Sequence, residues 1–179
     1  MRRKTRRPKS FMLKELLQGR FINHPLHPMA VHLPVGLWMM SLIMDVAFMV
    51  SGSPSFALVS YYCILVGLIG ALIAIPAGLS DYLEIPASTR PKRIATAHLI
   101  LNLVIFILYG VEFLNRRAFQ GGPPSLVTGS QFGFNLLAIF LLGLSGYLGG
   151  LLVYDYGIGY KPQRRGHAEP PEIRKIRAA

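Results

Sequence analysis

The fold is decided by an uncharged stretch of 23 residues, Ala57-Leu-Val-Ser-Tyr-Tyr-Cys-Ile-Leu-Val-Gly-Leu-Ile-Gly-Ala-Leu-Ile-Ala-Ile-Pro-Ala-Gly-Leu79. A helix rises about 1.5 Å per residue, so a stretch of this length crosses the roughly 30 Å hydrocarbon core of a bilayer. Three further apolar runs occupy residues 29–52, 95–115 and 131–154, and charged residues make up only 15% of the chain. Only helices satisfy every backbone group within one span, so the sequence predicts an all-α integral membrane four-helix bundle.

Lysine and arginine gather on one side of the predicted membrane. Seventeen of them lie in the amino-terminal segment, the second loop and the carboxyl-terminal segment, whereas Arg116 and Arg117 fall on the other side. Positive residues favour the cytoplasmic side, so both termini are expected in the cytoplasm. We divide the chain into a basic cytoplasmic arm over 1–22, with an amphipathic composition, a four-span membrane domain over 23–156, and a charged, proline-rich cytoplasmic tail over 157–179.

Composition also narrows the partners and the chemistry. The net charge of +11 flanks membrane spans and accompanies no nucleic-acid motif, so we expect contact with anionic lipids and no nucleic-acid partner. The single cysteine, Cys63, excludes a disulfide within the chain. No nucleophile and base, paired carboxylates or nucleotide loop is evident. The sequence therefore assigns no catalytic residue, and it points away from an enzyme.

Histidine marks the candidate site. Three of the five histidines lie in His24-Pro-Leu-His27-Pro-Met-Ala-Val-His32-Leu-Pro34, which opens the first span. Histidine is costly in a bilayer and is a common metal or haem ligand, so it needs a partner or a function there. The third span also has a polar stripe, because four of its polar residues fall within roughly 80° on a helical wheel: His98, Asn102, Tyr109 and Glu112.

This stripe is expected to face the bundle interior. The candidate partners are Ser41 and Asp45 in the first span and Asn135 and Ser145 in the fourth. Neither Asp45 nor Glu112 is assigned a function. The sequence shows no convincing repeat of helix pairs.

The depth of two histidines predicts a cofactor site. His32 and His98 each lie about three residues into a span, which places both roughly 5 Å inside the same membrane edge. Two histidines facing each other across a bundle can hold haem iron from both sides. Gly36 would leave room for a flat ring, and Asn102 would orient a ligand. We therefore predict a b-type haem-binding electron-transfer component with cofactor-binding residues His32, His98, Gly36 and Asn102.

Two alternatives stay open. His24, His27 and Asp81 could complete a site for a transition metal ion with His32 or His98, although the spacing matches no standard zinc pattern. The histidines could instead be hydrogen-bonded structural residues. The chain would then be a cofactor-free accessory or structural subunit of a larger membrane complex, with a protein partner or a second copy packed on its glycine-rich helix faces.

These motifs resemble a known family. The opening His24–Pro34 segment, Gly36-Leu-Trp38, Asp81-Tyr82-Leu83, Ala97-His98 with Asn102, and Gly146–Tyr154 with Gly157 are similar to the bacterial predicted membrane proteins of domain of unknown function 2231. The resemblance covers most of residues 23–160. It implies a four-helix bundle in the bacterial inner membrane, in a family without a settled activity. Some relatives are fused to or encoded beside Rieske-type domains, which favours redox chemistry.

Overall fold

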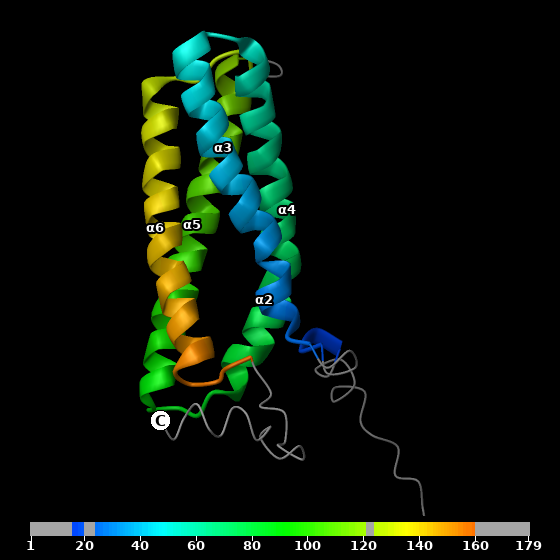
Figure 1. Ribbon diagram of the computed structural model, residues 1–179, viewed down its shortest axis with the longest axis vertical. Coiled ribbons are helices and arrows are strands. Elements are labelled where there is room, and N and C mark those ends of the chain that lie inside the picture. Colours follow the sequence, from blue (N-terminus) through cyan, green and yellow to red (C-terminus); the bar gives the residue numbers. More distant parts are fainter. Residues whose placement is uncertain (1–15, 20–23, 121–123, 160–179) are drawn as a thin grey trace, which may run out of the picture.

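The computed structural model describes residues 16–19, 24–120 and 124–159, and this part of the chain is all-helical. The helix α2 (Leu26–Ala30) leads into α3 (His32–Ser51), and α4 (Pro54–Glu84), α5 (Arg90–Gln120) and α6 (Gly129–Tyr154) follow. With α2 and α3 taken as one span, four helices are long and apolar enough to cross a membrane, which confirms the predicted fold class (Figure 1). Most of the predicted arm and tail lies outside the described residues.

Local sequence sets the helix ends. Gly52 ends α3 with a φ of 68°, a left-handed conformation that glycine adopts without strain. Pro54 begins α4, where its missing N–H is not needed. Thr128 caps α6: its hydroxyl accepts from the backbone N–H of Gln131, and its own N–H donates to the Gln131 side chain.

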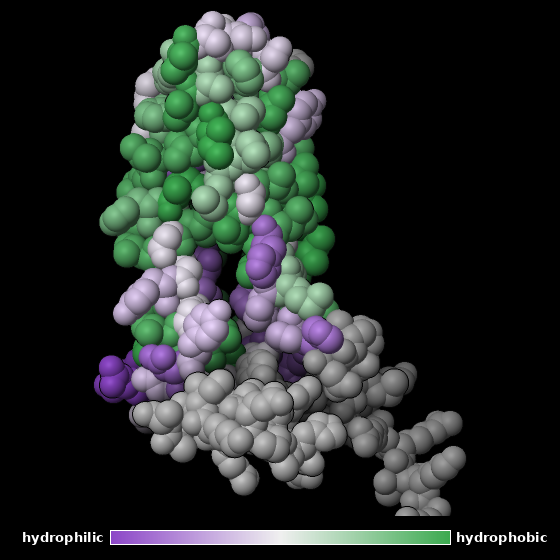
Figure 2. Space-filling model, viewed as in Figure 1, coloured by the Kyte–Doolittle hydropathy of each residue, from purple (hydrophilic) through white to green (hydrophobic). Residues whose placement is uncertain are grey.

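The bundle is closed at one end and divided at the other. The helices α2, α3 and α4 form one hairpin, and α5 and α6 form the second (Figure 1). We call the end where α2 and α5 begin the histidine end, because it includes His27 and His98, and the opposite end the arginine end, where Arg116 is buried. Figure 2 shows an opening between the two halves at the histidine end, bordered by hydrophilic surface, and a closed, largely hydrophobic surface beyond it. We call this opening the cleft.

The two hairpins repeat one burial pattern with a shift of 71 residues, the separation of Asp45 and Arg116. The buried residues of α3 and their counterparts in α5 are Pro34 and Ile105, Trp38 and Tyr109, Ser41 and Glu112, and Asp45 and Arg116. The same shift relates buried positions of α4 to α6: Ser60 and Gln131, Ile64 and Asn135, Gly67 and Ala138, and Ala74 and Ser145. The sequence shows no convincing repeat of helix pairs because most counterparts differ in residue type, whereas the pattern of burial recurs.

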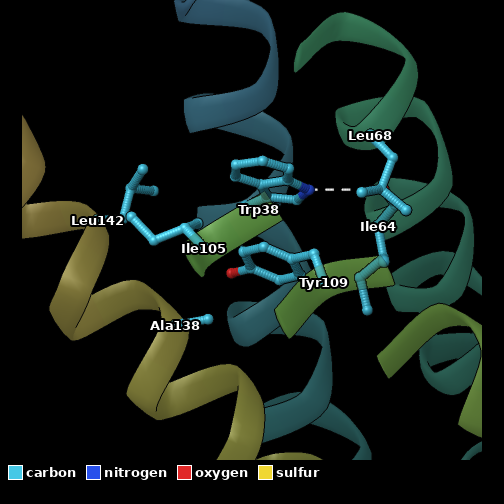
Figure 3. Close-up of a cluster of buried hydrophobic side chains, with 7 residues drawn as sticks. All are labelled: Trp38, Ile64, Leu68, Ile105, Tyr109, Ala138 and Leu142. Atoms are coloured by element: carbon cyan, nitrogen blue, oxygen red, sulfur yellow. Dashed lines mark hydrogen bonds between the residues drawn. The ribbon is translucent and has the colours of Figure 1, made fainter. Parts of the chain in front are cut away.

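Two counterparts touch each other directly. Trp38 stacks on Tyr109, with ring centroids 4.3 Å apart and planes 15° from parallel (Figure 3). Asp45 forms an ion pair with Arg116. Residues beside a two-fold axis contact their own counterparts. These contacts therefore indicate a pseudo-two-fold axis that runs between α3 and α5.

Candidate functional site

His27 lies on the backbone of α4. Its Nδ1 is 3.1 Å from the carbonyl oxygen of Ala74. One turn further along α4, a Cβ atom at Gly78 would come within 2.6 Å of the His27 Cε1 atom. Glycine at this position therefore makes room for the imidazole, which is half-buried.

His98 repeats this arrangement in the second hairpin. Its Nδ1 is 2.9 Å from the carbonyl oxygen of Ser145 on α6 and 3.1 Å from the Ser145 hydroxyl. A Cβ atom at Gly149, one turn further along α6, would lie 3.1 Å from the His98 Cε1 atom. In both hairpins the histidine and its carbonyl partner are 47 residues apart. The 71-residue shift thus relates both imidazoles, both carbonyls and both glycines.

These contacts fix the chemistry of the two rings. A carbonyl oxygen only accepts, so the Nδ1 atoms of His27 and His98 bear the protons and their Nε2 atoms have the lone pairs. An N–H to a backbone carbonyl is the usual support of a metal-binding histidine. The two rings belong to opposite hairpins and correspond to each other under the 71-residue shift. Each hairpin can therefore present one neutral imidazole nitrogen to a guest.

Asn102 makes the two histidines inequivalent. Its Nδ2 atom is 2.8 Å from the carbonyl oxygen of His98 and 3.1 Å from the His98 Nε2 atom. The counterpart of Asn102 in the first hairpin is the apolar Val31. Asn102 is thus beside His98, as the sequence predicted, and its amide must turn aside before Nε2 can bind iron.

The structure does not bring His32 to His98. His32 is exposed on α3, and Gly36, one turn further, is also exposed with no atom within 4 Å of a Cβ placed there. The pairing predicted for His32 and His98 therefore needs correction. The backbone stays helical through Val31, and five helical residues turn a side chain through roughly 140°, so His27 and His32 face different ways. His27 occupies the place that the sequence analysis gave to His32.

The alternative metal site is not assembled. His24 is exposed, and Asp81 lies beside Gly159, whose Cβ position is 3.5 Å from the Asp81 Oδ2 atom. Within residues 16–19, 24–120 and 124–159, no group of three or more His, Cys, Asp or Glu side chains is arranged to hold a metal ion. The predicted set of His24, His27 and Asp81 is therefore corrected.

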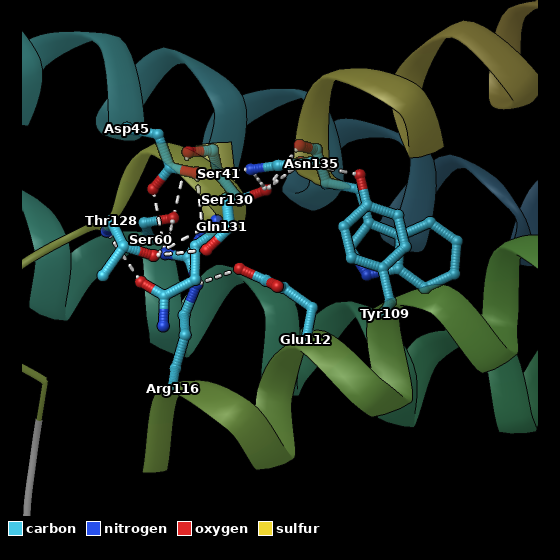
Figure 4. A network of polar contacts seen from close by, with 11 residues as sticks. Ser41, Asp45, Ser60, Tyr109, Glu112, Arg116, Thr128, Ser130, Gln131 and Asn135 are labelled. Carbon is cyan, nitrogen blue, oxygen red and sulfur yellow. Dashed lines mark hydrogen bonds and ion pairs between the residues drawn. The ribbon is translucent and has the colours of Figure 1, made fainter. Parts of the chain in front are cut away.

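A buried charge network lies at the arginine end (Figure 4). Arg116 donates from Nη1 and Nη2 to the two carboxylate oxygens of Asp45, at 2.9 and 2.7 Å, and from Nε to Glu112 at 2.7 Å. Its Nη1 also donates to the Ser60 hydroxyl at 2.9 Å. The sequence analysis placed Arg116 in an outer loop, which is wrong: its side chain is fully buried in α5. Arg116 follows Glu112, the last residue of the predicted polar stripe, by one helical turn. This spacing was the sequence signal that could have placed Arg116 in the helix.

The predicted partners of the polar stripe are confirmed. The Tyr109 hydroxyl donates to Asn135 Oδ1 at 3.0 Å, and Asn135 Nδ2 donates to Asp45 at 2.7 Å and to Ser41 at 3.1 Å. Ser145 holds His98. The polar contacts therefore form two groups in the bundle interior, one at each end, with the buried apolar residues Ile105 and Leu142 between them along α5 and α6.

The two glycine-rich faces differ. On α4, Gly67 and Gly78 lie against Trp38 and His27, so this face packs inside the bundle. On α6, Gly143 and Gly146 are exposed, with no described atom within 4 Å of their Cβ positions. A protein partner remains a prediction.

Comparison with known proteins identifies a family. The model of a family described as predicted membrane protein (DUF2231) matches residues 23–162. No curated protein and no solved structure matches the chain.

Proposed function

The chain belongs to the DUF2231 family of predicted membrane proteins, and we propose that it binds a b-type haem between His27 and His98 and transfers electrons through it. The observation that supports this proposal is the repeated setting of the two imidazoles. Each has its Nδ1 proton on a carbonyl of the neighbouring helix and lies over a glycine. A haem iron with two histidine ligands needs the same donor atom on both of its faces, and a two-fold arrangement supplies it.

The surroundings fit a planar, anionic guest. The cleft opens between the hairpins at the histidine end, and the side chains of His27 and His98 are half-buried. Arg90 and Arg93 are exposed at the start of α5, and Arg93 lies about 7.5 Å along the axis from His98. They are the proposed partners of the haem propionates. Lys92 is otherwise engaged, because its Nζ donates to the Tyr82 carbonyl at 2.9 Å.

The protein is a multi-pass membrane protein and contacts the lipid bilayer. We place it in the bacterial inner membrane with both termini and the histidine end in the cytoplasm. The burial of Arg116 supports this orientation, because it leaves Arg117 as the basic residue at the other end of α5. Anionic lipids would then surround the histidine end, and a redox partner would reach the haem from the cytoplasmic side.

Absorption spectroscopy tests the proposal. The protein, produced with sufficient haem and purified in detergent, should show the sharp reduced bands of a b-type haem after dithionite. His27→Ala and His98→Ala should each abolish or shift these bands, and the matched control His32→Ala should leave them unchanged.

A folded, monodisperse protein that binds no haem would refute the proposal and favour an accessory or structural subunit. Bands that survive both His27→Ala and His98→Ala would refute the ligand assignment. Bands lost in His32→Ala and His98→Ala but kept in His27→Ala would restore the pairing of His32 with His98.

A further inference from the structure

The charges at the arginine end do not balance. Arg116 and Asp45 are fully buried and Glu112 is 2% exposed, so one guanidinium faces two carboxyl groups inside the membrane. A net charge buried in a bilayer is unfavourable unless it is neutralised. Protonation of one of the two carboxyl groups would remove this net charge.

Asp45 is fully supported as a carboxylate. Its Oδ1 and Oδ2 atoms accept from the two terminal nitrogens of Arg116, and Oδ2 also accepts from Asn135. Such a bidentate arginine contact is among the strongest hydrogen-bonding arrangements for an ionised carboxylate. Protonation of Asp45 would weaken three contacts at once.

Glu112 is supported at one oxygen only. Its Oε1 accepts from Arg116 Nε at 2.7 Å, whereas Oε2 is buried and has no hydrogen-bond partner among the described residues. Its charged neighbours in this network are Arg116, which it contacts directly, and Asp45, which binds the other side of the same guanidinium. The other helices add uncharged groups to this network, Ser60 from α4 and Asn135 from α6.

We propose that Glu112 is a proton-binding site and holds the proton on Oε2. In this state the network of Asp45, Glu112 and Arg116 is neutral, and the Arg116 contact to Oε1 is kept. Loss of the proton leaves the carboxylate and a network charge of −1, and the proton passes to water at the arginine end. Glu112 lies eight residues, or about 12 Å, from the end of α5 at Gln120.

This site is separate from the histidine pair. Glu112 is 14 residues from His98, which is about 21 Å along α5. The inference therefore stands whether or not the protein binds haem. If the proposed haem is bound as well, the bundle has an iron site at the histidine end and a proton site at the arginine end.

Infrared spectroscopy of the protein in lipid nanodiscs tests the inference. The carbonyl band of one protonated carboxylic acid should be present at neutral pH, shift slowly in D2O, and shrink as the pH is raised. Glu112→Gln should remove the band, because glutamine keeps the Oε1 acceptor and has no acid. Asp155→Asn, at an exposed residue, should leave the band unchanged.

Labelling the unaltered chain with 13C-carboxyl glutamate provides a test that does not depend on the folding of a variant. The band should shift with labelled glutamate and not with labelled aspartate. Absence of a protonated-acid band in the folded protein, a band that survives Glu112→Gln, or a band that shifts only with labelled aspartate would each overturn the inference.

Discussion

Replacement of Asp45 by asparagine should destabilise the bundle strongly. Asp45 accepts two hydrogen bonds from Arg116 and one from Asn135, and no part of its side chain is exposed. In Asp45→Asn one acceptor oxygen remains. The other is replaced by an NH2 group, a donor that faces a donor of Arg116. The substitution also removes the negative charge that faces Arg116 across the pseudo-two-fold axis.

The expected loss follows from these contacts. A hydrogen bond to a charged group contributes about 1.5–3 kcal/mol, and removal of one partner of a buried ion pair costs about 3–5 kcal/mol. The retained oxygen places Asp45→Asn at the lower end, about 3 kcal/mol. Since about 1.4 kcal/mol corresponds to a factor of ten, the folding equilibrium constant should fall by about a hundredfold.

Unfolding by SDS in mixed micelles measures this loss. Trp38 is the only tryptophan of the chain, is 4% exposed and stacks on Tyr109, so its fluorescence reports the bundle core. Asp155→Asn is the matched control at an exposed position, and its unfolding free energy should change by less than about 0.5 kcal/mol. Equal unfolding free energies of Asp45→Asn and Asp155→Asn would refute the view that the ion pair of Asp45 and Arg116 stabilises the contact between the hairpins.

Three further substitutions test close contacts of the bundle. Gly78→Ala should lower the haem-to-protein ratio of the purified protein severalfold, because its Cβ would come within 2.6 Å of the imidazole that lies on it. Gly67→Ala should reduce the unfolding free energy by about 1–3 kcal/mol and shift the emission of Trp38, because the new methyl group would overlap the indole Nε1. In the double variant Trp38→Tyr with Tyr109→Trp, addition of Ala138→Gly should restore part of the stability lost, since Ala138 is the counterpart of Gly67; the same SDS titration measures this gain.

Two exposed glycines of α6 provide the controls. No described atom lies within 4 Å of the Cβ positions of Gly143 and Gly146. Gly143→Ala and Gly146→Ala should therefore leave the haem-to-protein ratio unchanged and keep or slightly raise stability, because alanine favours helix. A loss of stability in these controls as large as in Gly67→Ala would show that close packing is not the cause.

The features that sequence analysis predicted are those with a local signal. Four helices follow from the length of the apolar runs, and the interior polar stripe follows from helical spacing alone. The partners of His98 and Tyr109 could be predicted as well, because Ser145 and Asn135 are polar residues of the fourth span at matching depth.

The remaining features depend on three-dimensional packing. The choice of His27 over His32 depends on which side of the helix faces α4 and on the space that Gly78 leaves there, and neither has a distinctive sequence signal. Arg116 looks like a loop residue until Asp45, 71 residues earlier, is seen to face it. The repeat was missed because counterparts share burial and seldom share residue type.

The pseudo-two-fold axis explains at which positions the two hairpins have different residues and at which they have the same residue. Two separate identical hairpins would place like residues together along such an axis, so that position 45 would set Asp against Asp or Arg against Arg. One continuous chain allows opposite charges at Asp45 and Arg116 and different rings at Trp38 and Tyr109. The hairpins thus differ in residue type where a difference stabilises their contact. They have the same residue, histidine, at positions 27 and 98, and the proposed haem site needs this identity, because an iron with two histidine ligands binds one imidazole on each face.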